Sequence, residues 1–419
     1  MNQPTPAAAA AELAVINHLR QPPPHGKKRV IWFHNQADHY FVNMLDALNQ
    51  TGTAEYIGIF FSPPPGASVL TKLPERSHYL FIGAGEVQQG TAWADRAMRP
   101  DAKEIIAGAK FDMAIVGGYD YRIKRWLFNH GRAQQIPTAI WTDSNLHAEF
   151  DGTLKKAAKR IAKRILLRKM VGQLDRFLCA NGSGVEYWKY YGAPAQKTLI
   201  CTCLSEVAAA VTPDESLQIA LLAKCGIDTE PARGRRLLFT AARLVPAKGL
   251  HLMIAAYRQL GLAQKGWMWV IAGTGPLEAE LRQQAGDLNG AGIYFVGVQP
   301  HDVVKALSGQ AAAFVLPSVY EPHGIVVAEA MGAGTPVIGS DAGGAALDLV
   351  EPGVTGWLFK NGEVEDLTRA VREATANPAQ LAAMRPACRR KYEQWYGQYS
   401  PLVQVPKIVA ELVENKPRG

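Results

Sequence analysis

Short apolar runs alternate with helix-like segments along most of the chain. Each run has the length of a single buried strand, whereas the segments between the runs repeat apolar residues at helical spacing. This alternation predicts parallel strands joined by helices, as in a doubly wound α/β sheet. The predicted strands are Arg29–His34, Tyr56–Phe61, His78–Ile82, Met113–Gly117, Thr138–Thr142, Phe177–Ala180 and Thr198–Thr202, followed by Arg236–Ala241, Trp267–Ala272, Ile293–Val296, Ala313–Leu316 and Val337–Gly339. The predicted helices include Tyr40–Asn49, Ala102–Ala109 and Arg122–Asn129.

The alternation loosens between Glu206 and Gly234, where prolines and glycines interrupt it. We therefore predict two α/β domains in series, residues 27–210 and 211–395. They are flanked by an N-terminal extension, residues 1–26, and by a C-terminal helix, residues 396–419. Ligands of such sheets bind outside the carboxyl ends of the strands, so two facing domains should enclose a cleft.

One strand–loop–helix unit, Phe314–Met331, carries the clearest candidate chemistry. Its loop places Glu321 before a turn at Pro322 and Gly324, and Glu329 follows inside the predicted helix. Backbone N–H groups at a helix N-terminus suit a phosphate, and carboxylates accept hydrogen bonds from paired hydroxyls. The pattern suits a ligand with hydroxyls at both ends and phosphate between, such as a nucleotide sugar. An ordinary βα turn with two solvated glutamates is the alternative.

Two cations, Arg243 and Lys248, follow the strand predicted at Arg236–Ala241 and precede Gly249. Arginine binds phosphate oxygens bidentately, and lysine acts as a point charge. Breaking a sugar–pyrophosphate bond leaves a dianionic leaving group, which needs positive charge in place beforehand. The pair therefore fits a diphosphate site, with a solvated pair of loop cations as the alternative.

These segments resemble the motifs of retaining glycosyltransferases of family 4. Glu321–Glu329 is similar to the Glu-x7-Glu signature, with His323 in place of the usual Phe. Ala242–Gly249 resembles G-R-L-x-x-x-K-G, with Ala242 for the first glycine, and Ile271–Pro276 resembles h-x-G-x-G-P. Gly343-Gly344 and Gly353–Gly356 match the segment after the signature. The resemblance is strong from about Arg236 to Asp366 and weak before Val171.

The resemblance implies an α/β fold of two Rossmann-like doubly wound parallel-sheet domains facing a central cleft, the GT-B type. In that fold the last helix commonly crosses back onto the N-terminal domain. It implies a metal-independent, retaining hexosyltransferase that uses a nucleotide-diphosphate sugar and no other cofactor, with UDP-sugars favoured over GDP-sugars. The acceptor would be a glycan or a lipid-linked molecule in surface polysaccharide, lipopolysaccharide or glycolipid biosynthesis. Retention by front-face attack, with the leaving phosphate taking the acceptor's proton, requires no protein nucleophile.

The resemblance also assigns roles to residues of this sequence. The catalytic candidates are Glu321, near the hydroxyls of the transferred sugar, and Arg243 and Lys248, which would bind the diphosphate. Glu329 would bind the ribose hydroxyls. The other donor-binding candidates are Gly273, Thr274, Gly275, Val298, Gln299, His323, Gly324 and Ile325.

The N-terminal half departs from the family pattern. The loop after the first strand lacks the paired glycines of many members, and no histidine follows the strand that begins at Phe111. Polar residues at predicted strand ends are the remaining acceptor-site candidates, and each is also an ordinary turn or cap residue. These candidates are His34, Asn35, Asp120 and Asp143.

Charge adds a further expectation. The chain of 419 residues has a net charge of +8, which favours anionic partners. The segment Lys155–Lys169 is dense in cations, and a helix there would gather Leu154, Ala158, Ile161, Ile165 and Leu166 into an apolar stripe. Such a helix is typical of attachment to an anionic membrane. A solvated helix that packs its stripe on its own domain is the alternative.

Other features limit the compartment and the rival functions. We expect neither a signal peptide nor a transmembrane helix. The five scattered cysteines fit a reducing cytoplasm, with the protein peripheral on the inner face of the plasma membrane. Cys201-Thr202-Cys203 lacks a second ligand pair, so no metal site is predicted. The rivals are another GT-B enzyme, such as a sugar phosphorylase or a nucleotide-sugar epimerase, and a nucleic-acid-binding protein. No nucleic-acid motif is recognisable, so no such partner is expected.

Overall fold

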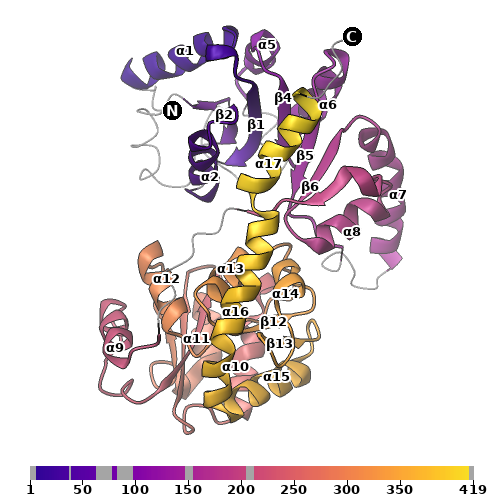
Figure 1. Cartoon of the computed structure of the whole chain (residues 1–419). Coiled ribbons are helices and arrows are strands. Elements are labelled where there is room, and N and C mark those ends of the chain that lie inside the picture. Colours follow the sequence, from indigo (N-terminus) through magenta and orange to yellow (C-terminus); the bar gives the residue numbers. More distant parts are fainter. Residues whose placement is uncertain are drawn as a thin grey trace.

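The computed structural model describes residues 6–36, 39–62, 78–82, 98–146, 154–203 and 212–414. These residues form two parallel sheets with helices packed on them, one sheet in each half of the chain (Figure 1). The predicted fold class, two Rossmann-like α/β domains, is therefore confirmed.

The first domain is built on a seven-stranded sheet with the order β3-β2-β1-β4-β5-β6-β7. Side chains of the interior strand β1 (Arg29–Gln36) alternate between two cores, with Ile31 and Phe33 on one face and Val30 and Trp32 on the other. Both faces are covered, so the middle parts of the strands are mostly apolar. The strands are β1 (Arg29–Gln36), β2 (Glu55–Ser62), β3 (Tyr79–Phe81), β4 (Met113–Gly117), β5 (Thr138–Thr142), β6 (Arg176–Cys179) and β7 (Thr198–Ile200). The helices are α1 (Pro6–Arg20), α2 (His39–Gln50), α5 (Ala102–Gly108), α6 (Arg122–Ala133), α7 (Leu154–Val171) and α8 (Gly182–Tyr190), with short turns η1 (Pro24–Gly26) and η3 (Ala195–Lys197).

The second domain is built on a six-stranded sheet with the order β10-β9-β8-β11-β12-β13. The strand order reverses at β8, which pairs with both β9 and β11, and such a reversal opens a crevice at the strand ends. The strands are β8 (Arg236–Ala241), β9 (Trp267–Ala272), β10 (Ile293–Phe295), β11 (Ala313–Leu316), β12 (Val337–Ser340) and β13 (Gly356–Phe359). The helices are α9 (Glu215–Lys224), α10 (Leu250–Gln259), α11 (Glu278–Ala285), α12 (His301–Gln310), α13 (Ile325–Gly332), α14 (Gly344–Leu349), α15 (Val364–Ala376), α16 (Pro378–Tyr399) and α17 (Pro401–Val409), with short turns η4 (Pro246–Lys248), η5 (Gly286–Leu288) and η6 (Ala410–Glu414).

One strand was not predicted. β13 has four residues and begins with a glycine, so its sequence carries a weak strand pattern. A Cβ atom at Gly356 would lie 2.0 Å from the carbonyl oxygen of Val337, so only glycine permits this close pairing with β12. A second difference concerns β1, which continues to Gln36 and so carries His34 and Asn35 on its last residues.

The last two helices join the domains. α16 lies along the second domain, and α17 continues over the first, so that the yellow end of the chain spans both (Figure 1). Val405, Ile408 and Val409 of α17 are buried in the core that contains Trp32 of β1. At the junction, the N–H of Thr202 donates to the carbonyl of Tyr399 at 2.9 Å. The C-terminal segment therefore belongs structurally to both domains.

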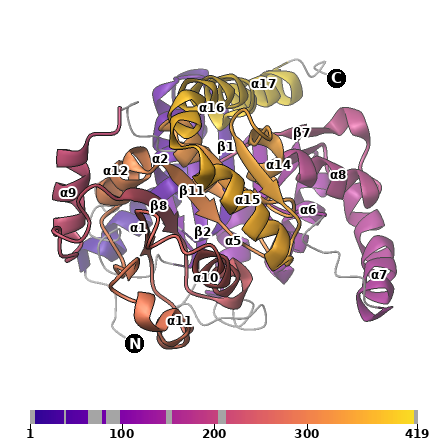
Figure 2. The ribbon, with the colours of Figure 1, turned by 90° about the horizontal axis from the view of Figure 1, so that it is seen from below.

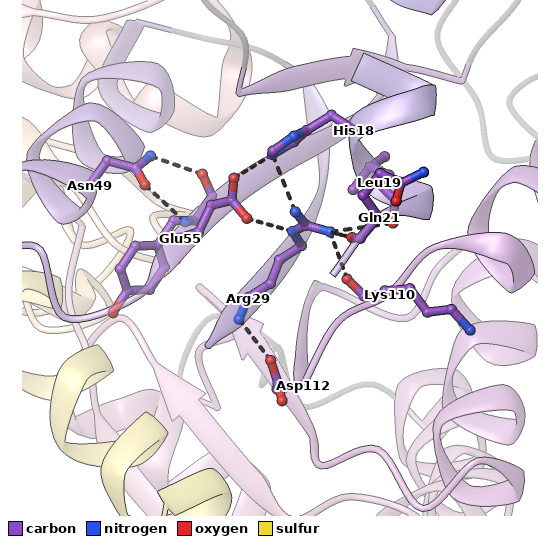
Figure 3. Close-up of polar contacts among 9 residues, drawn as sticks. His18, Leu19, Gln21, Arg29, Asn49, Glu55, Lys110 and Asp112 are labelled. Carbon is purple, nitrogen blue, oxygen red and sulfur yellow. Dashed lines mark hydrogen bonds and ion pairs between the residues drawn. The ribbon is translucent and has the colours of Figure 1, made fainter. Parts of the chain in front are cut away.

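The first helix is fixed to the first sheet by a buried ion-pair cluster (Figure 3). Arg29 of β1 is completely buried, and its Nε donates to Glu55 Oε2 at 2.6 Å. His18 of α1 contacts the other carboxylate oxygen at 2.5 Å. Burial raises the pKa of Glu55, but the hydrogen bonds from His18 and Arg29 outweigh it and leave the pKa below its ordinary value. The cluster therefore connects α1, β1 and β2.

The basic segment forms α7, which lies at the outer margin of the first domain (Figure 2). Ile161, Ile165 and Leu166 are 65%, 71% and 75% exposed, so this part of the predicted stripe does not pack on the domain. Lys163 instead lies over tyrosine rings, at 4.9 Å from the centroid of Tyr187. The side chains of residues 154–160 lie outside the described part of the chain. Within the described residues, no helix is both long and apolar enough to cross a membrane.

Candidate functional site

A cleft of about 560 Å³ lies between the two domains. It is lined from the first domain by α2 and by residues at or after the ends of β1, β5 and β7. The second domain contributes the end of β8, the cation loop and the loop that leads into α13. The structure thus brings together many of the predicted site residues, because the strand ends of both sheets face the same space. The predicted residues on its lining are His34, Asp143, Arg243, Lys248, Glu321, His323, Gly324 and Ile325.

The second domain contributes a cation and a carboxylate in direct contact. Lys248 Nζ lies 2.5 Å from Glu321 Oε2, and the hydroxyl of Ser318 donates to the same oxygen at 3.2 Å. The side chains are only 17% and 9% exposed. Arg243 lines the cleft with an exposed side chain. A diphosphate placed here would therefore meet one exposed guanidinium and one ammonium already held by Glu321.

Two glycines set the local backbone around these charges. Gly249 has a φ of 60°, and a Cβ there would lie 2.0 Å from the carbonyl oxygen of Pro317, so the cation loop packs tightly on the end of β11. Gly324 has a φ of 82° and precedes the first turn of α13. Its left-handed conformation turns the chain into the helix directly beside Glu321. The N–H of Val327 donates to the carbonyl of Gly324 at 2.9 Å, and the N–H groups before it lack intrahelical acceptors, as at any helix start.

Glu329 lies in α13, in a small hollow that shares Ala241 and Val326 with the cleft. Its side chain is 8% exposed, and its Oε1 has no hydrogen-bond partner within the described residues. His301 Nε2 lies 3.8 Å from this oxygen, which is beyond hydrogen-bond distance. A buried carboxylate oxygen without a donor is costly, so this position is suited to a ligand hydroxyl.

The rim beside Glu329 is a contact between the domains. The hydroxyl of Tyr40, at the start of α2, lies 3.1 Å from His301 Nε2, at the start of α12. The rings of His39 and His301 meet edge to face with their centroids 4.8 Å apart. These aromatic residues were not among the sequence candidates, because nothing local marks two histidines and a tyrosine from separate domains as neighbours.

The glycine-rich turn supports the cation loop instead of lining the cleft. A Cβ at Gly273 would lie 2.0 Å from the carbonyl oxygen of Ala242, and one at Gly275 would lie 2.4 Å from that of Leu244. Thr274 is bonded through its hydroxyl to Glu278. These contacts require the small residues for a close backbone approach; their predicted role in donor binding stays a prediction.

Val298 and Gln299 also lie outside the lining of the cleft. Val298 is 75% exposed, and Gln299 donates from its side chain to the carbonyl of Val296 at 2.5 Å. Their predicted contact with the nucleobase stays a prediction.

The polar groups of the first domain centre on a buried lysine that the sequence did not reveal. Lys124 of α6 donates to Asn35 Oδ1 and to Asp120 Oδ1, each at 2.5 Å. Its side chain is fully buried, which lowers its pKa, while the charges of Asp120 and Asp143 offset part of that effect. Asn35 and Asp120 therefore hold Lys124, whereas Asp143 and His34 reach the cleft.

Asp143 lines the cleft and is exposed to it, although other protein atoms surround its carboxyl on the remaining sides. Burial raises the pKa of its carboxyl, and the charges of Glu321 and Asp120 act in the same direction. Its own backbone N–H and the charge of Lys124 counteract part of the rise. A carboxyl perturbed in this way, within a cleft, is a candidate for a functional group.

His323 replaces the usual aromatic residue of the signature and is buried between the domains, with 6% exposure. Its Nδ1 lies 3.3 Å from Asn181 Nδ2, and its Nε2 lies 3.5 Å from the hydroxyl of Thr202. Burial lowers the pKa of its imidazole to about 4. The ring is therefore neutral at physiological pH and brings no positive charge to the site.

Residues 228–391, within the second domain, match the family model described as Glycosyl transferases group 1. The segment that resembles this glycosyltransferase family therefore carries the cation loop and the signature loop. The amylovoran biosynthesis glycosyltransferase AmsK of Erwinia amylovora is 30% identical over 183 residues, 42% of this chain and 44% of AmsK. A glycogen synthase of Mycobacterium tuberculosis is 36% identical over 162 residues, 38% of this chain and 39% of the synthase. The matches span less than half of each of these relatives.

Solved glycosyltransferase structures resemble the whole two-domain chain. Anabaena HepE, crystallised with UDP and glucose, superposes with a TM-score of 0.66 and 17% identity, covering 93% of this chain and all of HepE. WaaG, a glycosyltransferase involved in lipopolysaccharide biosynthesis, superposes with a TM-score of 0.65 and 14% identity over 92% of this chain. At such identities the likeness concerns the fold, which is of the GT-B type.

Proposed function

We propose that the chain is a retaining, metal-independent glycosyltransferase. It takes a sugar from a nucleotide-diphosphate sugar and transfers it to a glycan or a lipid-linked acceptor in surface polysaccharide or glycolipid biosynthesis. The observation that carries the proposal is the cleft itself. It places Arg243 and the Lys248–Glu321 pair beside a hollow in which a buried oxygen of Glu329 lacks a donor.

In the proposed complex, Lys248 and Arg243 contact the diphosphate and stabilise the negative charge that grows on it as the glycosidic bond breaks. Phosphate oxygens can share Lys248 with Glu321, because an ammonium has three donors. Glu321 then presents its carboxylate to hydroxyls of the transferred sugar. Glu329, with its unpartnered oxygen, accepts hydrogen bonds from the ribose.

The proposed acceptor side is formed by Asp143 and His34. The carboxylate of Asp143 accepts a hydrogen bond from an acceptor hydroxyl and orients it, and the leaving phosphate takes the proton. Retention then follows from attack on the face that the leaving group vacates, without a protein nucleophile.

The names of similar proteins support the substrate class. Among the curated relatives are a putative colanic acid biosynthesis glycosyltransferase of Salmonella typhimurium and a GDP-mannose-dependent phosphatidylinositol monomannoside mannosyltransferase of Mycolicibacterium smegmatis. HepE binds UDP. We favour a UDP-sugar over a GDP-sugar as the donor of this chain, with the acceptor drawn from the same chemical classes.

We also propose that α7 attaches the protein to an anionic membrane, on the cytoplasmic face of the plasma membrane. Ile161, Ile165 and Leu166 are exposed, and the side chains of Arg164 and Arg168 beside them are exposed as well. An apolar ridge among cations matches a surface of lipid tails and anionic headgroups. Lys163 contributes less, because it lies over tyrosine rings of its own domain.

A screen of nucleoside diphosphates by thermal shift tests the donor assignment. A ligand present at a hundredfold its dissociation constant stabilises a protein by about 2.7 kcal/mol, which is readily seen as a higher melting temperature. We expect UDP, or failing that GDP, to raise the melting temperature, and the same diphosphate to be released from its sugar conjugate on incubation with acceptor extracts. If no nucleoside diphosphate raises the melting temperature, the proposed function is wrong.

A further inference from the structure

Two asparagines of the first domain hold the backbone of the signature loop, residues 321–324. Asn181 Nδ2 donates to the carbonyl of Pro322 at 2.9 Å. Asn145 Nδ2 donates to the carbonyl of Glu321 at 3.3 Å and to that of Ala342 at 2.9 Å. The exposed fractions of Asn181 and Asn145 are 0% and 3%. The loop that carries the donor-site candidates is thus fixed from the opposite domain.

The amides of these asparagines have little freedom to turn. Asn181 Oδ1 accepts the backbone N–H of Gly184 at 2.9 Å and so caps α8. Asn145 Oδ1 accepts the hydroxyl of Ser183 at 2.6 Å. Each oxygen is occupied within the first domain, so each Nδ2 is directed across the interface. The neutral ring of His323 accepts alongside, with its Nδ1 at 3.3 Å from Asn181 Nδ2.

The start of α14 holds the same loop from a second side. The N–H of Gly344 donates to the carbonyl of Glu321 at 3.3 Å, and the N–H of Ala345 donates to that of His323 at 2.7 Å. A Cβ at Gly344 would lie 2.2 Å from Asn181 Nδ2, so glycine is required where the asparagine enters. The carbonyls of residues 321, 322 and 323 are therefore all engaged away from the cleft.

Fixing a carbonyl also fixes the N–H that follows it. In a trans peptide the C=O of one residue and the N–H of the next point in opposite directions. Asn181, by holding the carbonyl of Pro322, sets the direction of the N–H of His323. The bond from Ala345 does the same for the N–H of Gly324. No acceptor within the described residues is bonded to either N–H, and His323 and Gly324 both line the cleft.

We propose that Asn181 is a positioning residue of the donor site. It orients the backbone N–H of His323 toward the diphosphate, and it does so only when the two domains are in contact. The inference rests on the proposed function, because it assigns this N–H group to a bound diphosphate. It makes diphosphate affinity depend on a residue of the first domain that does not line the cleft. Asn145 only holds the loop, because the carbonyl of Glu321 is followed by Pro322, which has no N–H.

The test uses Asn181→Asp. Aspartate keeps the oxygen that caps α8, since Asp and Asn cap helices equally well. It loses the Nδ2 donor while its carboxyl is ionised. Glu321 and Asp348 also face this interface, and the N–H of Gly182 donates to Asp348 at 3.0 Å. Their charge and the burial should raise the pKa of the introduced carboxyl.

A matched control exists elsewhere in the first domain. Asn49 donates from Nδ2 to the carbonyl of Tyr56 and accepts the N–H of Tyr56 at Oδ1, both at 2.9 Å (Figure 3). Asn49→Asp therefore removes the same kind of donor from a backbone carbonyl, away from the cleft lining.

Calorimetric titration with UDP and GDP, at about pH 6 and about pH 8.5, gives the readout. At the higher pH, Asn181→Asp should bind the diphosphate about tenfold more weakly than the wild type, the value of one charge-assisted hydrogen bond. The deficit should shrink at the lower pH, where the protonated carboxyl donates again. Asn49→Asp should match the wild type at both pH values.

The possible failures are distinguishable. Binding by Asn181→Asp equal to that of the wild type at the higher pH would overturn the inference alone. A deficit that is the same at both pH values and comes with a lower melting temperature would overturn it too, because a general loss of structure would explain it. Absence of binding by the wild type would overturn the proposed function, and the inference with it.

Discussion

Replacement of Lys248 by alanine perturbs the cleft most directly. In the structure its Nζ lies 2.5 Å from Glu321 Oε2, and its side chain is only 17% exposed. Loss of one well-placed charge contact to a transition state costs about 2.7–4 kcal/mol, or roughly 10²–10³ in rate. We therefore expect Lys248→Ala to lower kcat/KM for donor turnover by roughly 10²–10³.

The substitution also leaves Glu321 without its cation, which should lower the stability of the fold. A second variant separates this loss of stability from the loss of activity. The side chain of Glu321 is 9% exposed, and after the substitution its carboxylate would still accept from the hydroxyl of Ser318. An uncompensated buried charge destabilises the fold. The double variant Lys248→Ala/Glu321→Gln removes that charge, so its melting temperature should recover while its activity stays low. Steady-state kinetics and thermal unfolding of both variants provide the measurement.

Lys360 supplies the matched control in the same domain. It forms an ion pair with Glu363 at 2.5 Å, but its side chain is 67% exposed. Such surface pairs contribute little to stability, so Lys360→Ala should leave both stability and turnover close to wild type. If well-folded Lys248→Ala turns over the donor within about threefold of the wild type, the assignment of Lys248 to the diphosphate is wrong, since a lost charge contact should cost far more.

Three further predictions concern the fold, the acceptor side and the membrane. Arg29→Ala should lower the unfolding free energy by about 3–5 kcal/mol in denaturant titrations, because it strands Glu55 in a buried site. Because the pKa of Glu55 is lowered in the folded protein, the unfolding free energy of the wild type should fall as the pH drops below 4.5. It should fall less in Glu55→Gln, which has no carboxylate to protonate. The raised pKa of Asp143 predicts that the rate of sugar transfer falls at low pH, where this carboxylate is protonated. If the rate of Asp143→Asn falls at low pH as in the wild type, Asp143 is not the group responsible. Anionic vesicles should co-sediment the protein at low salt, less so as the Debye length shrinks from ~10 Å to ~3 Å. Binding should drop in Ile161→Ser/Ile165→Ser/Leu166→Ser. It should persist in the control Arg372→Gln/Arg390→Gln, which removes two exposed cations of α15 and α16 in the second domain. Equal binding to neutral vesicles would refute the electrostatic part.

The local sequence pattern predicted much of the fold, because buried parallel strands are short continuous runs of apolar residues. β4, β5 and β9 have the predicted bounds, and β4 is buried at every residue. β13 was not predicted, because four residues that begin with a glycine carry only a weak strand pattern. The exposure of Ile161 and Ile165 could not be predicted either, because an apolar stripe on a helix does not show whether another part of the protein packs on it.

The candidate site divides in the same way. Arg243, Lys248 and Glu321 could be predicted because each follows a strand, and strand ends of facing sheets converge. Lys124 could not, because its partner Asn35 is 89 residues away and is reached only through the packing of α6. Asn145 and Asn181 lie 176 and 141 residues from the carbonyls that they hold. Such contacts depend on how the domains meet, which no local pattern records.

Recognition of the ribose by Glu329 tests the central claim most directly, because the unpartnered oxygen of this residue is the observation that points to a nucleotide. The measurement is calorimetric titration of the wild type and Glu329→Gln with UDP and 2′-deoxy-UDP. A hydrogen bond to a charged group contributes about 1.5–3 kcal/mol, so the wild type should bind UDP at least about tenfold more tightly than the deoxy form. Glu329→Gln should lose most of that preference while retaining its melting temperature. Equal affinity of the wild type for the two ligands, or a full preference retained by the variant, would contradict the account.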